Sequence, residues 1–238
     1  MNKKILNNKI VLITGASRGI GAAVAKRFAR EGAHLILVSR NQGGLEKIDD
    51  EIRTSGIKPT LVPIDITDEK NMDLMASEIS KRFGKIDVLV GNAAILGPLS
   101  PMSHYDPKMW KNIFDVNVHA NWRLIRNFEM LLRQSKFGRA IFVTSGIARK
   151  IRAYWGPYSA SKAALEKMVL DWSEEIKKTN LKVNIIDPGR VRTDMRKAAY
   201  PGENPQINPH PDEVTDLFVQ LSDNNLRDNG KIFYQNQK

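Results

Sequence analysis

Short apolar segments alternate with longer amphipathic segments along most of the chain. The apolar segments are rich in β-branched residues and nearly continuous, which is typical of strands buried on both faces of a parallel sheet. They span residues 10–13, 35–38, 61–64, 88–90, 140–143 and 183–186. The segments between them have helical spacing, as Ile20, Val24 and Phe28 illustrate. This alternation predicts an α/β fold with a doubly wound, mostly parallel sheet and helices on both faces, in three layers.

The last part of the chain predicts one more helix and one more strand, preceded by a long loop. Residues 211–221 carry an apolar stripe at helical spacing, and residues 231–234 predict a seventh strand. The stripe consists of Val214, Leu217, Phe218 and Leu221. Residues 194–211 contain four prolines and little periodicity. We therefore expect a loop there, and loops of that length in compact domains are often lids, so we interpret it as a substrate lid.

Length and composition favour one domain that spans residues 1–238, because α/β domains of this size commonly stay undivided. Hydrophobic residues make up 42% and charged residues 26%, which is the balance of an ordinary globular protein. The chain has no cysteine, which excludes disulfides and thiolate metal sites. No apolar run approaches the roughly 18 residues that a membrane-spanning helix needs. We therefore expect a cytoplasmic protein that has no membrane partner.

The net charge of +11 could attract nucleic acid, anionic lipid or an acidic ligand. The basic residues are dispersed along the chain, however, and a solvated surface accounts for them equally well. None of the four histidines lies in a metal-ligand pattern with other histidines or carboxylates, so we expect no catalytic metal. Charge alone therefore does not identify a partner.

A glycine-rich turn follows the first predicted strand and leads into the first predicted helix. It reads Thr14-Gly15-Ala16-Ser17-Arg18-Gly19-Ile20-Gly21. Gly15 permits the tight turn, Gly19 lets the backbone approach a pyrophosphate, and Gly21 lets the helix pack closely on the strand. The N-terminus of the helix then offers N–H groups and a partial positive charge to the phosphates. The turn therefore predicts a dinucleotide site.

The end of the second predicted strand distinguishes between the two nicotinamide cofactors. A site that prefers NAD places an acidic side chain there, on the ribose 2′-hydroxyl, whereas a 2′-phosphate requires a cation. This chain has Arg40 and no acid at that point, and Arg18 could complete a clamp on a phosphate. NADP(H) is the preferred cofactor, and NAD(H) stays open.

A tyrosine and a lysine four residues apart follow the fifth predicted strand, which Ser145 ends. The spacing places Tyr158 and Lys162 on one helical face. A neighbouring ammonium stabilises a phenolate, so we expect Lys162 to lower the pKa of Tyr158 and to permit proton transfer near pH 7. Ser145 is placed to bond a substrate oxygen at the strand tip.

Together these motifs resemble the short-chain dehydrogenase/reductase family in its single-domain branch, over nearly the whole chain from Lys9 to Tyr234. The resemblance implies a Rossmann-type fold and an oxidoreductase that transfers a hydride between NADP(H) and a carbonyl or alcohol substrate. It implies that Tyr158 is the catalytic acid or base, that Lys162 tunes it and holds the nicotinamide ribose, and that Ser145 orients the carbonyl. Asn117 matches the family asparagine that supports a water-linked proton relay to the lysine.

The resemblance also implies a set of cofactor contacts. The set is Gly15, Ser17, Arg18, Gly19, Ile20, Gly21, Arg40, Asp65, Ile66, Asn92, Tyr158, Lys162, Pro188, Gly189, Val191 and Thr193. The chain departs from the family where Gly91-Asn92-Ala93-Ala94 replaces the usual Asn-Asn-Ala-Gly, which raises a question about the local backbone. Its final segment, residues 229–233, is also shorter and more polar than the usual ending.

Basic side chains precede the tyrosine, namely Arg149, Lys150 and Arg152, beside Tyr154 and Trp155. They suggest an anionic or acyl-linked substrate, against the alternative of a solvated loop. The resemblance implies pairing of the segments 110–132 and 158–177 between copies, and we expect a dimer or tetramer, with Met168, Val169 and Trp172 either in that interface or in the core. A non-catalytic NADP-binding or nucleic-acid-binding regulator on the same fold is the alternative, and the intact catalytic set argues against it.

Overall fold

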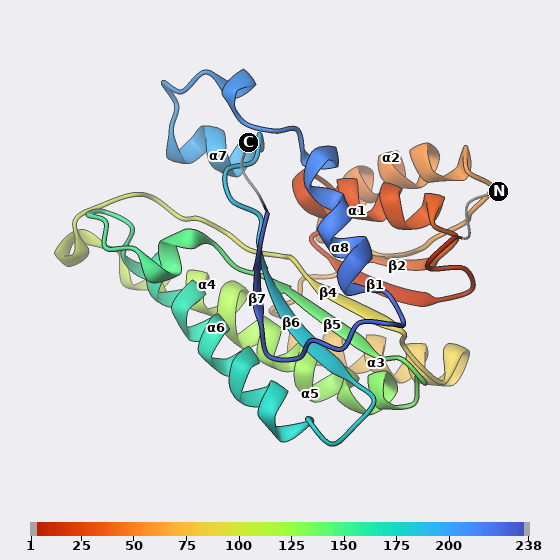
Figure 1. Ribbon diagram of the computed structural model, residues 1–238. Coiled ribbons are helices and arrows are strands. Elements are labelled where there is room, and N and C mark those ends of the chain that lie inside the picture. The colour runs from red at the N-terminus through yellow and green to blue at the C-terminus, as the bar shows by residue number, and fades with distance from the viewer. Residues whose placement is uncertain (1–3, 236–238) are drawn as a thin grey trace.

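A seven-stranded sheet in which every pairing is parallel forms the centre of the computed structural model, which describes residues 4–235 (Figure 1). The strands are β1 (Ile10–Thr14), β2 (His34–Val38), β3 (Thr60–Val62), β4 (Val88–Gly91), β5 (Arg139–Val143), β6 (Lys182–Asp187) and β7 (Ile232–Tyr234). Their order in the sheet is β3-β2-β1-β4-β5-β6-β7. The direction of winding reverses between β1 and β4, which is where sheets of this topology bind their ligands. The predicted sheet is confirmed.

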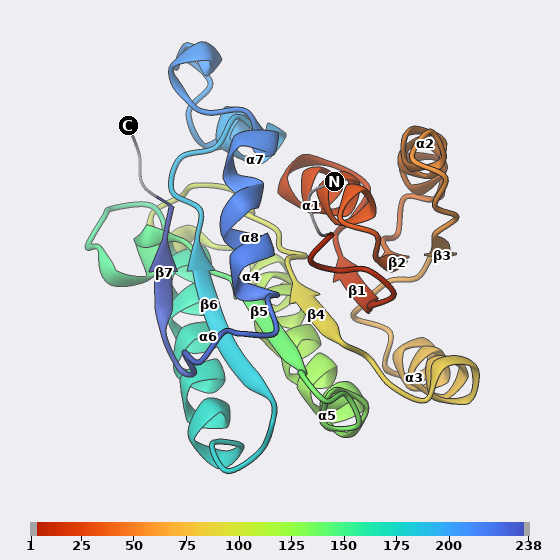
Figure 2. The same ribbon diagram turned by 45° about the vertical axis from the view of Figure 1, so that its right-hand side comes forward.

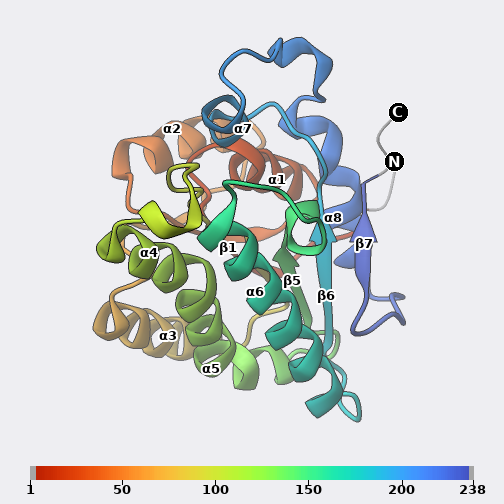
Figure 3. The ribbon, with the colours of Figure 1, turned by 90° about the vertical axis from the view of Figure 1, so that its left-hand side faces the viewer.

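Helices cover both faces of the sheet (Figure 2). One face carries α1 (Gly19–Arg30), α2 (Gln42–Arg53) and α8 (Thr215–Leu221). The other carries α3 (Glu69–Phe83), α4 (Pro107–Phe114), α5 (Ala120–Arg133) and α6 (Gly156–Glu175). Figure 3 shows α4, α5 and α6 side by side, with α7 (Asp194–Ala199) beyond the carboxyl ends of the strands. The fold therefore has the three layers that the alternation predicts.

Two apolar cores lie on opposite faces of the sheet and explain why the strand segments read as continuous apolar runs. Leu12 of β1 packs into the core beneath α3, α5 and α6, whereas its neighbours Val11 and Ile13 pack into the core beneath α1, α2 and α8. Successive side chains of a strand point to opposite faces, so burial on both faces favours apolar side chains at consecutive positions.

The segment 194–211 differs from the predicted loop, because it contains the short helix α7 and the 3-10 turns η4 (Pro205–Ile207) and η5 (Pro211–Val214). Thr193 starts α7 by accepting a hydrogen bond from the backbone N–H of Arg196. Two of the four prolines stand at the first positions of the 3-10 turns, where the missing N–H costs nothing. Helix α8 begins only after η5, and its stripe is buried as predicted except for partly buried Leu217.

The segment 110–132 is not one helix. A single π-helical segment, η2 (Asp115–His119), separates α4 from α5. Such π turns shift the register of the backbone hydrogen bonds, and they occur frequently at functional sites. The remaining 3-10 elements are η1 (Met102–His104) and η3 (Gly146–Arg149). Within residues 4–235, none of the helices has the length and apolar character needed to cross a membrane.

Candidate active site

A cavity of about 600 Å³ lies at the carboxyl ends of the strands. Segments that follow each of β1 to β6 line it, which is the ligand position expected for an open α/β sheet. Every residue of the predicted site lines this cavity except Gly21 and Asn117. The structure therefore gathers side chains that are separated by up to 178 positions, from Gly15 to Thr193, at one place.

Close contacts leave no room for a side chain at Gly15 and Gly21 of the glycine turn. Gly15 has a φ of +65°, in the left-handed region. A Cβ at Gly21 would lie 2.3 Å from the carbonyl oxygen of Gly15, so Gly21 acts through packing rather than by lining the cavity. The Nδ2 atom of Asn92 donates to the carbonyl oxygens of Thr14 and Gly15, at 3.0 and 3.3 Å. Asn92 therefore fixes the turn from the neighbouring strand.

The first turn of α1 is open to an anion. Arg18, at the N-cap position, makes no side-chain capping bond, and the first turn contains no acidic residue. By contrast, Asp68 caps α3 and Asp106 caps α4. Unsatisfied N–H groups and the positive end of a helix dipole attract a phosphate. These residues fit the pyrophosphate of a dinucleotide.

Two exposed arginines stand at the same end of the cavity. Arg40 lies 3.3 Å from Asp65, and Arg18 lies 3.4 Å from Asp194, both in solvent-exposed ion pairs. Burial raises the pKa of Asp65, but hydrogen bonds from Thr67 and the charge of Arg40 have the larger combined effect and hold this pKa below its ordinary value. Exposed pairs of this kind are weak, so each guanidinium can turn to a bound phosphate.

Tyr158 is buried, and its surroundings do not lower its pKa. Burial raises the pKa of the Tyr158 hydroxyl to about 12, a hydrogen bond with Ser145 opposes this effect, and the charge of Asp187 adds to it. The spacing of Lys162 predicts a lowered pKa for Tyr158, whereas in this structure the pKa is raised, because desolvation of the phenolate is the largest effect. At neutral pH the hydroxyl keeps its proton.

Lys162 lies one helical turn further along α6, with its Nζ atom 5.9 Å from the centre of the Tyr158 ring. The ammonium donates a hydrogen bond to the carbonyl oxygen of Val143, at 2.8 Å. Burial lowers the pKa of Lys162 to about 8, although the charge of Glu166 raises it. The predicted common face of the two side chains is confirmed. Strand β5 ends at Val143, so Ser145 stands two residues beyond the strand.

Asn117 lies in the π-helical segment and is fully buried. Its side chain pairs with the backbone of Ile95, accepting from the N–H and donating to the carbonyl oxygen, both at 2.9 Å. Nδ2 also donates to the Ser161 hydroxyl, which accepts at 3.0 Å. The side chain therefore ties the segment after β4 to helix α6, beside the cavity rather than in it.

Arg149 does not stand in a free cationic rim. Its guanidinium donates to the carboxylates of Glu166 and Asp187, whose side chains are only 10% and 8% exposed. The Thr144 hydroxyl also donates to Glu166, at 2.6 Å. Neither Arg149 nor Lys150 nor Arg152 lines the cavity. The rim of cations that the sequence suggested is thus absent from the cavity wall.

Several residues at the catalytic end were not singled out by sequence reasoning. They are Leu96, Ile147, Met195 and Ala199, which pack with Tyr158 in one apolar cluster, and the carboxylates of Glu166 and Asp187. Glu166 stands four residues after Lys162, a spacing that could have suggested a partner on the same helical face. No local pattern marks the other residues, because they reach the site through the fold.

Ala94 replaces the usual glycine without backbone strain. Among residues 4–235, the non-glycine residues with positive φ are Asn8 and Tyr154, so Ala94 adopts an ordinary conformation. At the neighbouring Gly91, a Cβ would lie 2.5 Å from the Phe142 ring. Phe142 therefore occupies the space that a side chain at position 91 would need.

Within residues 4–235, no cluster of three or more potential metal ligands is present.

Comparison with known proteins places the chain among oxidoreductases. The sequence model of the short chain dehydrogenase family matches residues 9–204. An uncharacterized oxidoreductase of Escherichia coli, YciK, is 36% identical over 96% of this chain and 92% of its own length. The benzil reductase ((S)-benzoin forming) IRC24 of Saccharomyces cerevisiae is 35% identical over 90% of this chain and 82% of its own. A short chain dehydrogenase structure from Shigella flexneri, complexed with NADP, has a TM-score of 0.94 at 35% identity, covering 98% of this chain and 99% of that one.

Proposed function

Because the chain belongs to the short-chain dehydrogenase family and is an oxidoreductase, we propose that it reduces a carbonyl group with NADPH and that Tyr158 donates the proton. One observation carries this proposal. The hydroxyls of Tyr158 and Ser145 face each other at the carboxyl ends of the strands, in the same cavity as the glycine turn and beside the buried ammonium of Lys162.

The residues of the cavity fit NADP(H). The open first turn of α1 suits a pyrophosphate, and Arg18 and Arg40 suit a 2′-phosphate. The related Shigella flexneri structure is complexed with NADP, and a further one from Escherichia coli CFT073 is complexed with NADPH. Asp65, Ile66, Asn92, Pro188, Gly189, Val191 and Thr193 would complete the cofactor site. NAD(H) is the less favoured cofactor.

Each polar side chain of the site has a separate role in the proposed reaction. The nicotinamide supplies the hydride, and the chain orients the carbonyl and supplies the proton. Ser145 and Tyr158 both offer a hydroxyl to the carbonyl oxygen. A pKa of about 12 keeps Tyr158 protonated at pH 7, as a proton donor must be. The ammonium of Lys162 stabilises the phenolate that remains, and Asn117 holds the segment after β4 against α6.

The test is a screen of neutral and acidic carbonyl compounds that follows NADPH consumption at 340 nm. We expect turnover of at least one ketone and a loss of kcat of at least about a hundredfold in Tyr158→Phe. Tyr234→Phe is the matched control, because the Tyr234 side chain is exposed and does not line the cavity. Turnover that survives Tyr158→Phe undiminished would contradict the proposal.

Three coarser features of the molecule belong to the same proposal. We propose that residues 1–238 form one catalytic domain in the cytoplasm, and that the segment 194–211 is a lid over the substrate.

We also propose a homo-oligomer, a dimer or tetramer, that pairs through α5 and α6. There Trp122 is 48% exposed and, with Met168, lines a groove of about 540 Å³. Val169 and Trp172 are buried and belong to the core. Light scattering of wild type and Trp122→Glu would test the pairing.

A further inference from the structure

We infer that the substrate carries an aromatic or similarly bulky apolar group next to the reacting carbonyl, and that no anionic group accompanies it there. This inference rests on the proposed carbonyl reduction and names the substrate class of the same site. Four features of the catalytic end of the cavity support it: the apolar wall, the placement of Trp155 in that wall, the pairing of the nearby cations and the position of Met195.

An apolar wall surrounds the catalytic hydroxyl. Leu96 and Ile147 are each 8% exposed and form one cluster with Tyr158, against which Leu99, Trp155, Met195 and Ala199 pack. Of these residues, Leu96, Trp155, Met195 and Ala199 line the cavity. A charged substrate group placed against this wall would lose its hydration without a partner, whereas an apolar group gains by burial.

Trp155 is placed by a constrained backbone. The preceding residue, Tyr154, has a φ of +73°, which is unfavourable for a residue with a side chain. Two hydrogen bonds hold it there, because its carbonyl oxygen accepts from the Tyr105 hydroxyl at 3.0 Å and from the Ser100 N–H at 3.2 Å. Strain of this kind persists where the surroundings enforce it, and here it sets the position of an aromatic wall.

The Trp155 ring lies between two other aromatic rings. Its centre is 6.0 Å from that of Tyr158 and 5.9 Å from that of Tyr200, with interplanar angles of 58° and 39°. These distances are typical of favourable aromatic pairs, and one ring of the group is that of Tyr158 itself. A substrate ring can join the group by the same interaction.

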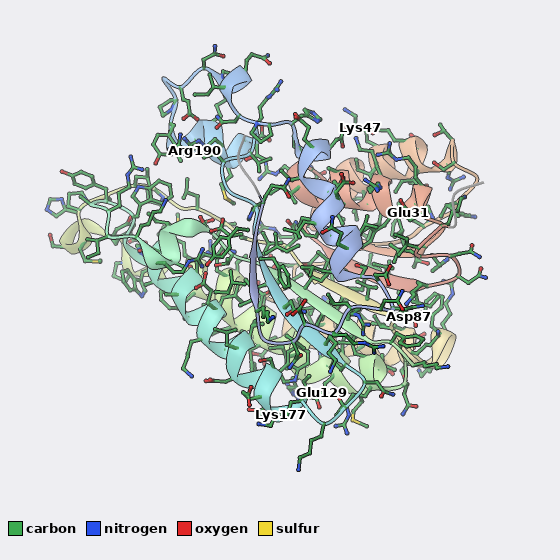
Figure 4. All side chains as sticks on the ribbon, viewed as in Figure 1. Glu31, Lys47, Asp87, Glu129, Lys177 and Arg190 are labelled. Carbon is green, nitrogen blue, oxygen red and sulfur yellow. The ribbon has the colours of Figure 1, made fainter. Side chains whose placement is uncertain are left out.

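The cations near this wall are either paired with carboxylates or lie outside the cavity. The Arg152 guanidinium lies over the rings of Trp155 and Tyr200, at 5.9 and 5.2 Å. Arg196 pairs with Glu203 through two of its nitrogen atoms, and Glu203 also accepts from Asn208. Arg149 is held by its two carboxylates, as described above. Figure 4 shows Arg190 beside α7, but Arg190 does not line the cavity. Arg149, Arg152 and Arg190 do not line the cavity, and Arg196, which does, is paired with Glu203, so none of the four offers a free site for a carboxylate next to Tyr158.

Met195 fills the space above the catalytic hydroxyl. Its sulfur atom accepts a weak hydrogen bond from the Tyr158 hydroxyl, at 3.7 Å. A substrate oxygen must take over this bond, so the flexible thioether has to move and then pack on the substrate. Methionine sulfur makes favourable contacts with aromatic rings, and an apolar substrate ring therefore suits the displaced side chain.

The experiment compares three keto compounds that differ in one group. Ethyl benzoylformate has a phenyl group and a neutral ester, benzoylformate has the same phenyl group and a carboxylate, and ethyl pyruvate replaces the phenyl group with methyl. We expect kcat/KM with NADPH to be at least about tenfold higher for ethyl benzoylformate than for either of the others. Equal or better turnover of benzoylformate, or no preference for phenyl over methyl, overturns the inference and leaves the proposed reduction intact. No turnover of any compound in the wider screen overturns the proposed function itself.

Variants of Trp155 and Arg152 show which side chain causes the preference for a phenyl group and a neutral ester. Trp155→Ala should lower the ratio of kcat/KM for ethyl benzoylformate to that for ethyl pyruvate at least about fivefold, whereas Trp155→Phe should retain most of this ratio. Thermal melting with and without NADPH shows whether each variant is folded. Arg152→Met should leave the ratio of ester to acid unchanged. A selective loss of benzoylformate turnover in Arg152→Met would show that this cation binds an anion, which contradicts the inference.

Discussion

Replacement of Lys162 by methionine is expected to stabilise the folded chain when no cofactor is added. Burial lowers the pKa of Lys162 from 10.5 to about 8. A fall of that size corresponds to a desolvation cost of about 3 kcal/mol, at about 1.4 kcal/mol for each pH unit. Methionine has a similar volume and no charge, so it removes this cost. It also removes the hydrogen bond to Val143, worth about 1 kcal/mol, which leaves an expected gain of about 2 kcal/mol at pH 7.

The sign of the pH dependence follows from the lowered pKa. Between pH 8 and 10.5 the unfolded chain holds a proton on Lys162 that the folded chain lacks, so the stability of the wild type rises with pH in this window. Below pH 8 the desolvation cost of the charged Lys162 is almost fully present. The difference between variant and wild type should therefore shrink by about 2 kcal/mol from pH 7 to pH 10.

Urea denaturation at pH 7, 8, 9 and 10, followed by tryptophan fluorescence, measures this difference. Lys167→Met is the matched control on the same helix, because Lys167 is exposed and should contribute less than about 0.5 kcal/mol at any of these pH values. A Lys162→Met variant that is less stable than wild type at pH 7, or whose advantage stays constant with pH, would refute the reasoning. The variant should also lose most of its reductase activity.

Three further changes have defined outcomes. Arg149→Met should lower the free energy of unfolding by about 2 kcal/mol, because two buried carboxylates lose their partner, whereas Arg152→Met should cost less than about 1 kcal/mol in the same urea titration. Gly21→Ala should lower stability by about 2 kcal/mol and raise the KM for NADPH, since its Cβ would lie 2.3 Å from a carbonyl oxygen. Arg40→Ala should reduce the ratio of kcat/KM for NADPH to that for NADH at least about tenfold, and an unchanged ratio would remove Arg40 from the cofactor site.

The elements that the sequence predicts well are those whose signal is local. Each predicted strand is present, and the central ones carry a clear signal because burial on both faces favours consecutive apolar residues, as in β1, where Val11 and Leu12 face opposite cores. The glycine turn and the spacing of Tyr158 and Lys162 are also local, since a turn and one helical step determine them. These features locate both ends of the cavity before any packing is known.

What the sequence does not predict depends on distant partners. Helix α7 is too short to show a period, and it begins because Thr193 caps it. Arg149 looks like a free surface cation until the fold brings the carboxylate of Asp187, from β6, to its side. The pKa of Tyr158 depends on how completely α7 and the segment after β4 cover the hydroxyl, through Met195 and Leu96. The spacing of Tyr158 and Lys162 shows that an ammonium lies near the hydroxyl. It does not show how much water the fold excludes from that place.

The exclusion of water links the catalytic and the substrate-binding properties of the site. The same burial raises the pKa of Tyr158 to about 12 and lowers that of Lys162 to about 8, so near pH 7 the folded chain holds a protonated phenol beside an ammonium. That combination favours proton donation to a carbonyl oxygen over proton removal from an alcohol. Leu96, Trp155 and Met195 pack against Tyr158 and line the cavity, so in the proposed reaction they are also the side chains that a substrate would contact. In the proposed reaction, a wall that keeps the proton on Tyr158 would also contact an apolar ketone, so substitutions in this wall should change both the pH profile and the substrate preference.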